Sequence, residues 1–289
     1  MPVRDGVAPS FIYLLPGQTG SLLEFLERRF PAVGRDTWVA RMLRGEVRDE
    51  DNTVLLPDAI CGGGRKVYYY REIERETPIP FEESILHCDE HLLVADKPHF
   101  LPVTPSGRFL QETLLVRLRR KTGLEHLTPI HRLDRETAGV VIFSHDPATR
   151  GIYQSLFQKR SMIKVYEALA GPLNAEFPLT YRSRMVDGKP FFRMREAAGE
   201  PNSETVIKPL ERRGGQVLYE LRPNTGRKHQ LRVHMAALGI PIVNDAFYPE
   251  ALPCKGEDVS APLKLLARSI AFVDPLSGLP REFRSRRSL

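Results

Sequence analysis

The sequence predicts an α+β fold with a mixed, mostly antiparallel sheet, together with a small separate α/β module at the N-terminus. After residue 77, strand-like segments do not alternate regularly with helix-like segments, as they would in a doubly wound parallel sheet. A stretch with two prolines, ERETPIPFEE at 74–83, separates this part from an N-terminal unit of different composition. We therefore expect two domains, at residues 1–77 and 78–289.

The N-terminal unit is expected to contain two short helices and a strand. Ser21 and Glu24 have the spacing of a capping box, in front of a stripe of apolar residues at helical spacing. Asp36 would cap the second helix and Gly45 would follow its end, while GRKVYYYREI at 64–73 reads as a strand. Six arginines are interspersed here: Arg28, Arg29, Arg35, Arg41, Arg44 and Arg48. This pattern fits a small basic RNA-binding module, and it also fits an ordinary solvated helical face.

The larger part mixes the two kinds of element. Strands are expected at 91–95, 139–144, 164–170, 216–223 and 263–272. Helices are expected at 109–123, 146–158 and 225–239. Gly123 would end the first helix. Asp146 and Pro147 would begin the second, and Thr225 and Gly239 would bound the third.

Bulk properties exclude several classes of protein. The 289 residues carry a net charge of +6, which points towards a polyanionic partner, although charge alone does not decide this. Cys61, Cys88 and Cys254 are scattered and lack CxxC spacing, so neither a disulfide framework nor a zinc site is indicated. The sequence shows no secretion signal and no apolar run long enough to span a membrane. We expect a cytoplasmic protein.

The stretch HRLDRETAG, at 131–139, places a charged cluster directly before the apolar run VVIFS. The cluster is expected to form a loop at the edge of a sheet. Asp134 could act there as a nucleophile or a base if water is excluded around it. The alternative is a structural aspartate that caps a turn.

A second cluster, RPNTGRKHQLRVH, spans 222–234. Gly226 at a helix start would let the backbone approach an anion, and Arg227 could pair with a phosphate or with a carboxylate such as Asp134. His229 and His234 are five residues apart, about 140° around a helix, so they cannot chelate one metal ion together. We expect one of them to face the core and the other the surface.

In the predicted strand at 164–170, Lys164, Tyr166 and Ala168 share one face. Tyr166 could be a half-buried packing residue, or it could stack on a base.

In this order the clusters resemble the RluA-type pseudouridine synthases. The matching segments are DKPHFLPV (96–103), HRLDRETAG (131–139), KVYEA (164–168), TGRKHQLRVH (225–234) and GIPIVNDAFY (239–248). The resemblance covers roughly residues 80 to 275. The N-terminal unit more loosely resembles an alpha-L RNA-binding module. The sequence departs from the family pattern at Phe100, Ala138, Asn244 and the segment LLA at 265–267.

The resemblance implies the pseudouridine synthase fold, with a catalytic cleft across its mixed sheet. It implies isomerisation of specific uridines to pseudouridine in structured RNA, without cofactor or metal. Asp134 would be the catalytic carboxylate, held ionised by Arg227, and Tyr166 would pack against the target base and assist proton transfer.

The resemblance also implies further contacts. Arg132 would fill the gap left by the flipped uridine, Lys164 and Lys228 would contact RNA, and Ile242 or Val243 would form the aliphatic wall. The basic N-terminal unit favours ribosomal RNA as the substrate, with transfer RNA as the alternative, and we expect a monomer without a membrane partner. Two other functions remain open: an inactive RNA-binding assembly factor on the same fold, and a glycosidase using Asp134 and Glu136.

Overall fold

A computed structural model describes residues 2–73, 76–252 and 259–289, and Cys254 lies outside these residues. The chain divides into two compact units. The first is Met1–Glu76 with Ser106–Gln111, and the second is Thr77–Pro105 with Glu112–Leu289. The short segment 106–111 was expected in the second domain. It lies in the first unit, where the backbone amides of Leu110 and Gln111 bind the Glu76 carboxylate.

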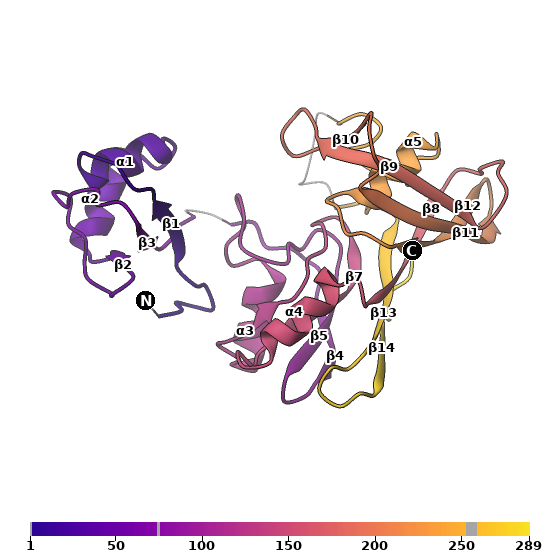
Figure 1. Ribbon diagram of the computed structural model, residues 1–289, viewed down its shortest axis with the longest axis horizontal. Coiled ribbons are helices and arrows are strands. Elements are labelled where there is room, and N and C mark those ends of the chain that lie inside the picture. Colours follow the sequence, from indigo (N-terminus) through magenta and orange to yellow (C-terminus); the bar gives the residue numbers. More distant parts are fainter. Residues whose placement is uncertain (1, 74–75, 253–258) are drawn as a thin grey trace. The chain divides into compact units, whose positions relative to one another are not determined.

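The first unit packs two helices on one side of a three-stranded antiparallel sheet (Figure 1). The helices are α1 (Leu22–Arg29) and α2 (Arg35–Leu43). The sheet has the order β1 (Ser10–Leu14), β3 (Arg65–Tyr69), β2 (Val47–Asp49). Its core is built from apolar residues of both layers, among them Leu14, Leu22, Leu26, Trp38, Met42 and Val67.

Most of the local expectations for this unit are confirmed. Ser21 and Glu24 form the predicted capping box, with both reciprocal hydrogen bonds present. The predicted strand corresponds to β3. Asp36, however, does not cap α2: the cap is Gly34, which has a positive φ of 78°, and Asp36 lies in the first turn. Strands β1 and β2 were not predicted.

The second unit is built on an eleven-stranded sheet. Its main path has the order β10-β9-β11-β12-β8-β13-β7-β5-β4, with β14 paired to β13 and β6 to β7. All the strand pairs are antiparallel except β7 with β13, so the predicted mixed, mostly antiparallel α+β fold is confirmed. The strands are β4 (Ser84–Cys88), β5 (Leu92–Lys97), β6 (Thr128–Pro129), β7 (Ala138–Ser144), β8 (Ile163–Ala170), β9 (Leu179–Asp187), β10 (Met194–Ala197), β11 (Ser203–Arg213), β12 (Gln216–Pro223), β13 (Leu265–Val273) and β14 (Pro280–Arg284).

Three helices accompany this sheet, and all are shorter than the sequence suggested. They are α3 (Leu114–Thr122), α4 (Arg150–Gln158) and α5 (Gln230–Ala237). Gly123 ends α3 in the left-handed conformation, as predicted. Asp146 instead begins a turn that precedes α4, and Thr225 lies in a loop before α5. No helix of the described segments is long and apolar enough to cross a membrane.

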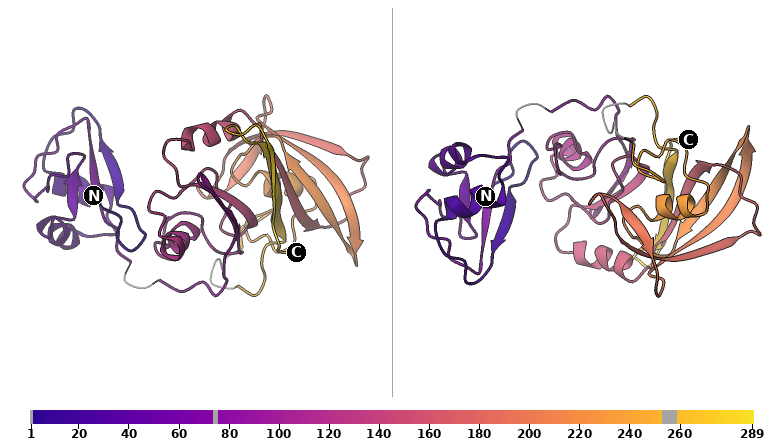
Figure 2. Two further views of the ribbon diagram at one scale, coloured as in Figure 1. Left: turned by 90° about the horizontal axis from the view of Figure 1, so that it is seen from below. Right: turned by 90° about the horizontal axis from the view of Figure 1, so that it is seen from above.

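Strand β13 joins the two halves of the large sheet, and it lies with β14 between the β4–β5–β7 group and the β8–β12 group (Figure 2). Its parallel contact with β7 is close: a Cβ added to Gly139 would lie within 2.8 Å of the Ala267 backbone nitrogen. Gly139 also has a φ of 117°, which L-residues with a side chain rarely adopt. This junction brings the loop before β7 next to β8 and β13.

Candidate active site

A cavity of about 370 Å³ opens where that loop meets β8, β13 and the start of α5. It is lined by residues 131–134, Thr137, Phe157, Lys164, Tyr166, Pro223, residues 225–232 and Leu265. Three of the sequence motifs, far apart in the chain, therefore meet around one cavity. Every residue predicted to act in catalysis or RNA contact lies on it: Arg132, Asp134, Lys164, Tyr166, Arg227 and Lys228.

The loop that carries Asp134 is anchored at its beginning by His131. The His131 ring stacks on Phe157 with 4.6 Å between ring centroids, and its Nε2 accepts a hydrogen bond of 3.0 Å from the backbone amide of Ile142. Burial lowers the pKa of His131 to about 3, so the ring is neutral and carries its proton on Nδ1. His131 is therefore a structural anchor for the loop.

The other end of the loop is anchored by the DKPH segment. The buried Lys97 ammonium donates to the carbonyls of Arg135 (3.0 Å) and Leu101 (2.7 Å). His99 Nδ1 lies 2.7 Å from the carbonyl of Glu136 and donates to it. Burial lowers the pKa of His99 to about 4. The backbone on both sides of Asp134 is thus fixed by side chains rather than by sheet pairing.

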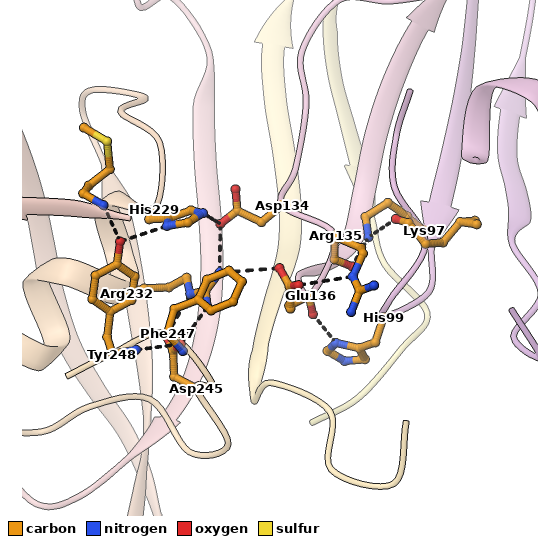
Figure 3. Close-up of polar contacts among 12 residues, drawn as sticks. Lys97, His99, Asp134, Arg135, Glu136, His229, Arg232, Asp245, Phe247 and Tyr248 are labelled. Carbon is orange, nitrogen blue, oxygen red and sulfur yellow. Dashed lines mark hydrogen bonds and ion pairs between the residues drawn. The ribbon is translucent and has the colours of Figure 1, made fainter. Parts of the chain in front are cut away.

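Asp134 faces two side chains of the second cluster (Figure 3). Its Oδ2 lies 3.5 Å from Arg232 Nη1 and 3.8 Å from His229 Nε2. The Asp134 side chain is 26% exposed, whereas that of Arg232 is 1% exposed. Asp134 is thus open to the cavity on one side, while a buried cation faces it on the other.

Arg232 is itself held by a second buried acid. Its Nε and Nη2 bind the two carboxylate oxygens of Asp245 at 2.8 and 2.6 Å, and Glu136 lies 3.6 Å from Nη1. Burial alone would lower the pKa of Arg232. The hydrogen bonds and charge of Asp245, with the charges of Asp134 and Glu136, raise it instead. The guanidinium is therefore a permanent cation with a fixed orientation.

The predicted pairing of Arg227 with Asp134 is wrong in this structure. Arg227 is exposed at the cavity, and its Nε donates to the carbonyl of Asn202 at 3.3 Å. The sequence assignment assumed that the helix begins near Thr225. It begins at Gln230, so Arg227 lies in the preceding loop and Arg232 lies on the buried first turn. One signal in the sequence could have pointed to Arg232. Asp245, in the segment GIPIVNDAFY, is an acid among apolar residues, and a buried acid needs a buried cation as its partner.

His229 and Tyr248 were not recognised as site residues. His229 precedes α5 in the left-handed conformation, with a φ of 56°. Its Nδ1 lies 2.9 Å from the hydroxyl of Tyr248, and that hydroxyl accepts a hydrogen bond from the backbone amide of Met194 at 2.8 Å. Burial lowers the pKa of His229, which keeps the ring neutral. A neutral ring that accepts at Nδ1 from Tyr248 presents Nε2–H to Asp134.

The prediction that one of the two histidines faces the surface is also wrong. His229 and His234 are both buried. His234 contacts the hydroxyls of Ser183, Ser203 and Thr205 and lies in the core beneath α5. In the described residues there is no group of three or more His, Cys, Asp or Glu side chains suited to hold a metal ion.

Tyr166 and Lys164 reach the cavity from β8, on the shared strand face that alternation predicts. Burial, and to a lesser degree the charge of Asp134, raises the pKa of Tyr166, so the phenol stays protonated at neutral pH. Lys164 Nζ donates to the carbonyl of Thr225 at 3.0 Å. Burial, with the nearby charge of Arg160, lowers the pKa of Lys164 to about 8. Lys164 is therefore still a cation at neutral pH.

The aliphatic wall differs from the prediction. Ile242 and Val243 do not line the cavity, which is bounded instead by Leu231 of α5 and Leu265 of β13. Ile242 is buried behind them in the same apolar cluster. The resemblance implied Ile242 or Val243 as the wall, but Ile242 belongs to the core behind the cavity.

Comparisons of the sequence with known proteins agree on one family. The family model described as RNA pseudouridylate synthase matches residues 91–237. An uncharacterized RNA pseudouridine synthase of Synechocystis is 30% identical over 239 residues, covering 80% of this chain and 81% of that protein. The dual-specificity RNA pseudouridine synthase RluA of Pasteurella multocida is 31% identical over 210 residues, covering 67% of this chain and 88% of that protein.

A solved structure agrees. Human RNA pseudouridylate synthase domain containing 1 superimposes with a TM-score of 0.60 at 25% sequence identity, over 74% of this chain and 86% of that one. Membership of one family therefore explains the fold, the order of the motifs and the cavity where they meet. The chain belongs to the RluA-type RNA pseudouridine synthases and is an enzyme of that class.

Proposed function

We propose that this enzyme isomerises specific uridines of ribosomal RNA and that Asp134 is its catalytic carboxylate. The observation that supports this role is that Asp134 is the one carboxylate lining the cavity, as far as the described residues go. Glu136 does not line it and is directed to Arg232. A glycosidase would need two carboxylates flanking a sugar bond, so this arrangement favours isomerisation.

The reaction breaks the bond from ribose C1′ to uracil N1 and forms a bond from C1′ to C5. C5 loses a proton and N1 gains one, so the atoms balance without water or a redox partner. Asp134 would act as a nucleophile or as the base in this sequence, and Arg232 with His229 would hold the carboxylate in place. Arg232 takes the partner role that the sequence suggested for Arg227.

Tyr166 would lie against the flipped base. Its protonated phenol can donate a hydrogen bond beside Asp134, and its ring supplies a flat surface. Extruding a uridine from a stacked RNA costs a few kcal/mol. Arg132, Lys164, Arg227 and Lys228 line the cavity with positive charge, which suits the phosphates on either side of that nucleotide.

We favour ribosomal RNA because the separate N-terminal unit would add binding surface for a large structured RNA. Transfer RNA remains the alternative, because the Pasteurella relative is named a dual-specificity enzyme and family membership does not choose one RNA. Free, scattered cysteines fit a cytoplasmic enzyme, and we propose that it acts as a monomer.

The catalytic role is tested with Asp134→Asn. We expect no detectable pseudouridine in single-turnover reactions, with RNA affinity within a few fold of wild type, because phosphate contacts supply most of the affinity. Glu136→Gln is the matched control, since it removes a carboxylate that touches Arg232 outside the cavity, and it should retain turnover. Substantial turnover by Asp134→Asn, or free uracil among the products of the wild type, would contradict the assignment.

The RNA target is tested separately. Pseudouridines are mapped in ribosomal and transfer RNA from a deletion strain and from the same strain complemented with Asp134→Asn. A site lost from ribosomal RNA in both strains supports the proposal. Loss confined to transfer RNA would show that the substrate assignment is wrong while leaving the reaction intact.

A further inference from the structure

The three-stranded sheet of the first unit has one face covered by helices and one face without them (Figure 1). Alternate residues of the strands point to opposite faces. Leu14, Val47, Val67 and Tyr69 point to the helices and are buried in the core of this unit. The residues between them form the opposite face. Several of these are large apolar residues, which is unusual for a surface in contact with solvent.

Three exposed apolar residues follow one another on this face along β1 and just beyond it. Phe11, Tyr13 and Leu15 are 57%, 50% and 62% exposed. Isolated exposed apolar residues need no explanation, but a contiguous row of this kind is typical of a binding surface.

The adjacent strand adds a further aromatic ring and a cation. Tyr68 lies opposite Phe11 and Lys66 lies opposite Tyr13 in the β1–β3 register. The rings of Phe11 and Tyr68 are 5.8 Å apart, and Lys66 Nζ is 5.4 Å from the Phe11 ring centroid. We call Phe11, Tyr13, Lys66 and Tyr68 the aromatic face.

Positive charge on this side is not neutralised by acids. Lys66 forms no ion pair within the residues that the structure describes. Arg48 of β2 lies opposite Tyr68, and its guanidinium binds the carbonyls of Gly45 and Asn52, which leave its charge intact. A surface that combines free cations with exposed rings is suited to a nucleic acid strand.

The helical side of the same unit has a different character. Arg35 pairs with Glu27 at 2.9 Å, and Arg44 pairs with Glu46 at 2.7 Å and Glu72 at 3.1 Å. Arg41 also pairs with Glu72. Three of the arginines that made the sequence look basic are thus engaged with carboxylates, which weakens the case for a helical RNA-binding surface.

We propose that the aromatic face binds an unpaired RNA segment, with bases stacked on Phe11, Tyr13 and Tyr68 and a phosphate near Lys66. This proposal rests on the proposed function, because it takes RNA as the substrate. Residues two apart on a strand are about 7 Å apart, wider than the spacing of stacked bases in a helix. Such rings accept bases that are splayed in a single strand, and paired RNA does not expose the faces of its bases.

The test uses the full chain with a double substitution, Phe11→Ala with Tyr13→Ala. Affinity is measured for a fluorescent oligouridylate of about 12 nucleotides and for a fully paired hairpin. We expect about tenfold weaker binding of the oligouridylate or more, and little change for the hairpin. Leu43→Ala is the matched control, because Leu43 is an exposed apolar residue of α2 on the other side of the unit. It should bind like wild type.

Charge is tested in the same way. Lys66→Ala should make the salt dependence of oligouridylate binding shallower, by about one in the slope. Arg35→Ala is its control, because the charge of Arg35 is already paired with Glu27. Ultraviolet crosslinking of the oligouridylate to wild-type protein should label peptides containing residues 10–15 or 65–69.

Several results would overturn the proposal. These are unchanged affinity in the double variant, crosslinks confined to α1 and α2, or self-association of the wild type that the double substitution abolishes, which would assign the face to a second copy of the chain. Failure of the proposed function looks different. Wild-type protein would then form no pseudouridine in the RNA tested, while its affinity for the oligouridylate would still respond to the substitutions.

Discussion

Arg232 binds Asp245 through Nε and Nη2, and this leaves Nη1 directed at Asp134. The bidentate bond fixes the plane of the guanidinium before any RNA is present. Arg232 and Asp245 are both almost completely buried, at 1% side-chain exposure. Asp245, which does not line the cavity, thus orients Arg232, and Arg232 in turn sets the position of the Asp134 carboxylate.

Arg232→Lys should lower the single-turnover rate by roughly 100-fold, because an ammonium cannot grip Asp245 and face Asp134 at the same time. RNA affinity should stay within a few fold, since Arg232 is buried. Arg232→Ala should also destabilise the protein by about 3–5 kcal/mol, because it leaves the buried Asp245 without its partner. Rates at saturating RNA and urea unfolding measure the two effects.

Arg227→Ala provides the contrast. Arg227 is exposed at the cavity and makes no ion pair with the carboxylates of the described residues, so it is placed to contact phosphate. We expect weaker binding, a salt dependence shallower by about one in the slope, and a normal rate at saturating RNA. A slow saturated rate for Arg227→Ala, together with a normal one for Arg232→Lys, would restore Arg227 as the partner of Asp134.

Tyr248→Phe should slow catalysis without weakening RNA binding. The phenol fixes the tautomer of His229 that presents Nε2–H to Asp134, and it also satisfies the backbone amide of Met194. Leaving that amide unpaired should destabilise the protein by about 1–3 kcal/mol. The rate is measured at saturating RNA, well below the unfolding transition.

A double-mutant cycle separates this role from general damage. His229→Asn keeps a residue that tolerates the left-handed conformation but is too short to bridge Tyr248 and Asp134. If Tyr248 acts through His229, then Tyr248→Phe should cost little additional rate in the His229→Asn background. Additive losses would mean that Tyr248 does not act through the imidazole.

The sequence was most informative where one local rule determines the structure. The capping box at Ser21 and Glu24, the glycine end of α3 at Gly123 and the apolar strand β7 depend on neighbouring residues alone. The resemblance of the motifs to the family predicted that Asp134 and Tyr166 belong to one site, and both residues line the cavity.

The errors at the site have two physical causes. Whether Arg227 or Arg232 meets Asp134 depends on where α5 begins, and the left-handed residue His229 delays that start. No local preference predicts this, because the conformation of His229 is supported by Tyr248, which follows 19 residues later. The wall was misassigned for a separate reason: the resemblance located the apolar segment that contains Ile242 and Val243, but it did not show which apolar side chains reach the cavity and which lie in the core behind it.

Gly139→Ala should destabilise the catalytic unit by about 3 kcal/mol or more. The added Cβ would clash with the backbone of Ala267 at the parallel contact of β7 and β13, and φ would be strained as well. Gly151→Ala is the control: Gly151 lies in α4 with open space around it and no positive φ, so the change should be neutral or slightly stabilising.

The single tryptophan makes this measurement specific. Trp38 is buried in the first unit, so its fluorescence reports the unfolding of that unit, whereas circular dichroism reports both units. Gly139→Ala should move the dichroism transition to lower urea and leave the fluorescence transition in place. If Gly139→Ala unfolded at the same urea concentration as wild type by circular dichroism, then β7 and β13 could move apart to accept the added Cβ without loss of stability.

RNA binding should weaken as the pH rises through about 8. Burial and the nearby charge of Arg160 lower the pKa of Lys164 from 10.5 to about 8, so this cavity cation loses its proton within an accessible range. Between pH 8 and 10.5 the unfolded chain holds that proton and the folded chain does not. The free energy of unfolding therefore gains a contribution that rises with pH over the same window, opposite in direction to the effect on affinity.

Lys164→Arg separates this effect from the titration of other groups, because a guanidinium stays charged throughout. Affinity for the target RNA is measured from pH 7 to 9 at two salt concentrations. Wild type should lose affinity over this range and show a salt slope smaller by about one at the higher pH, and Lys164→Arg should show neither change. If Lys164→Arg followed the same pH profile as wild type, the titrating group would lie elsewhere and Lys164 would not be the phosphate contact.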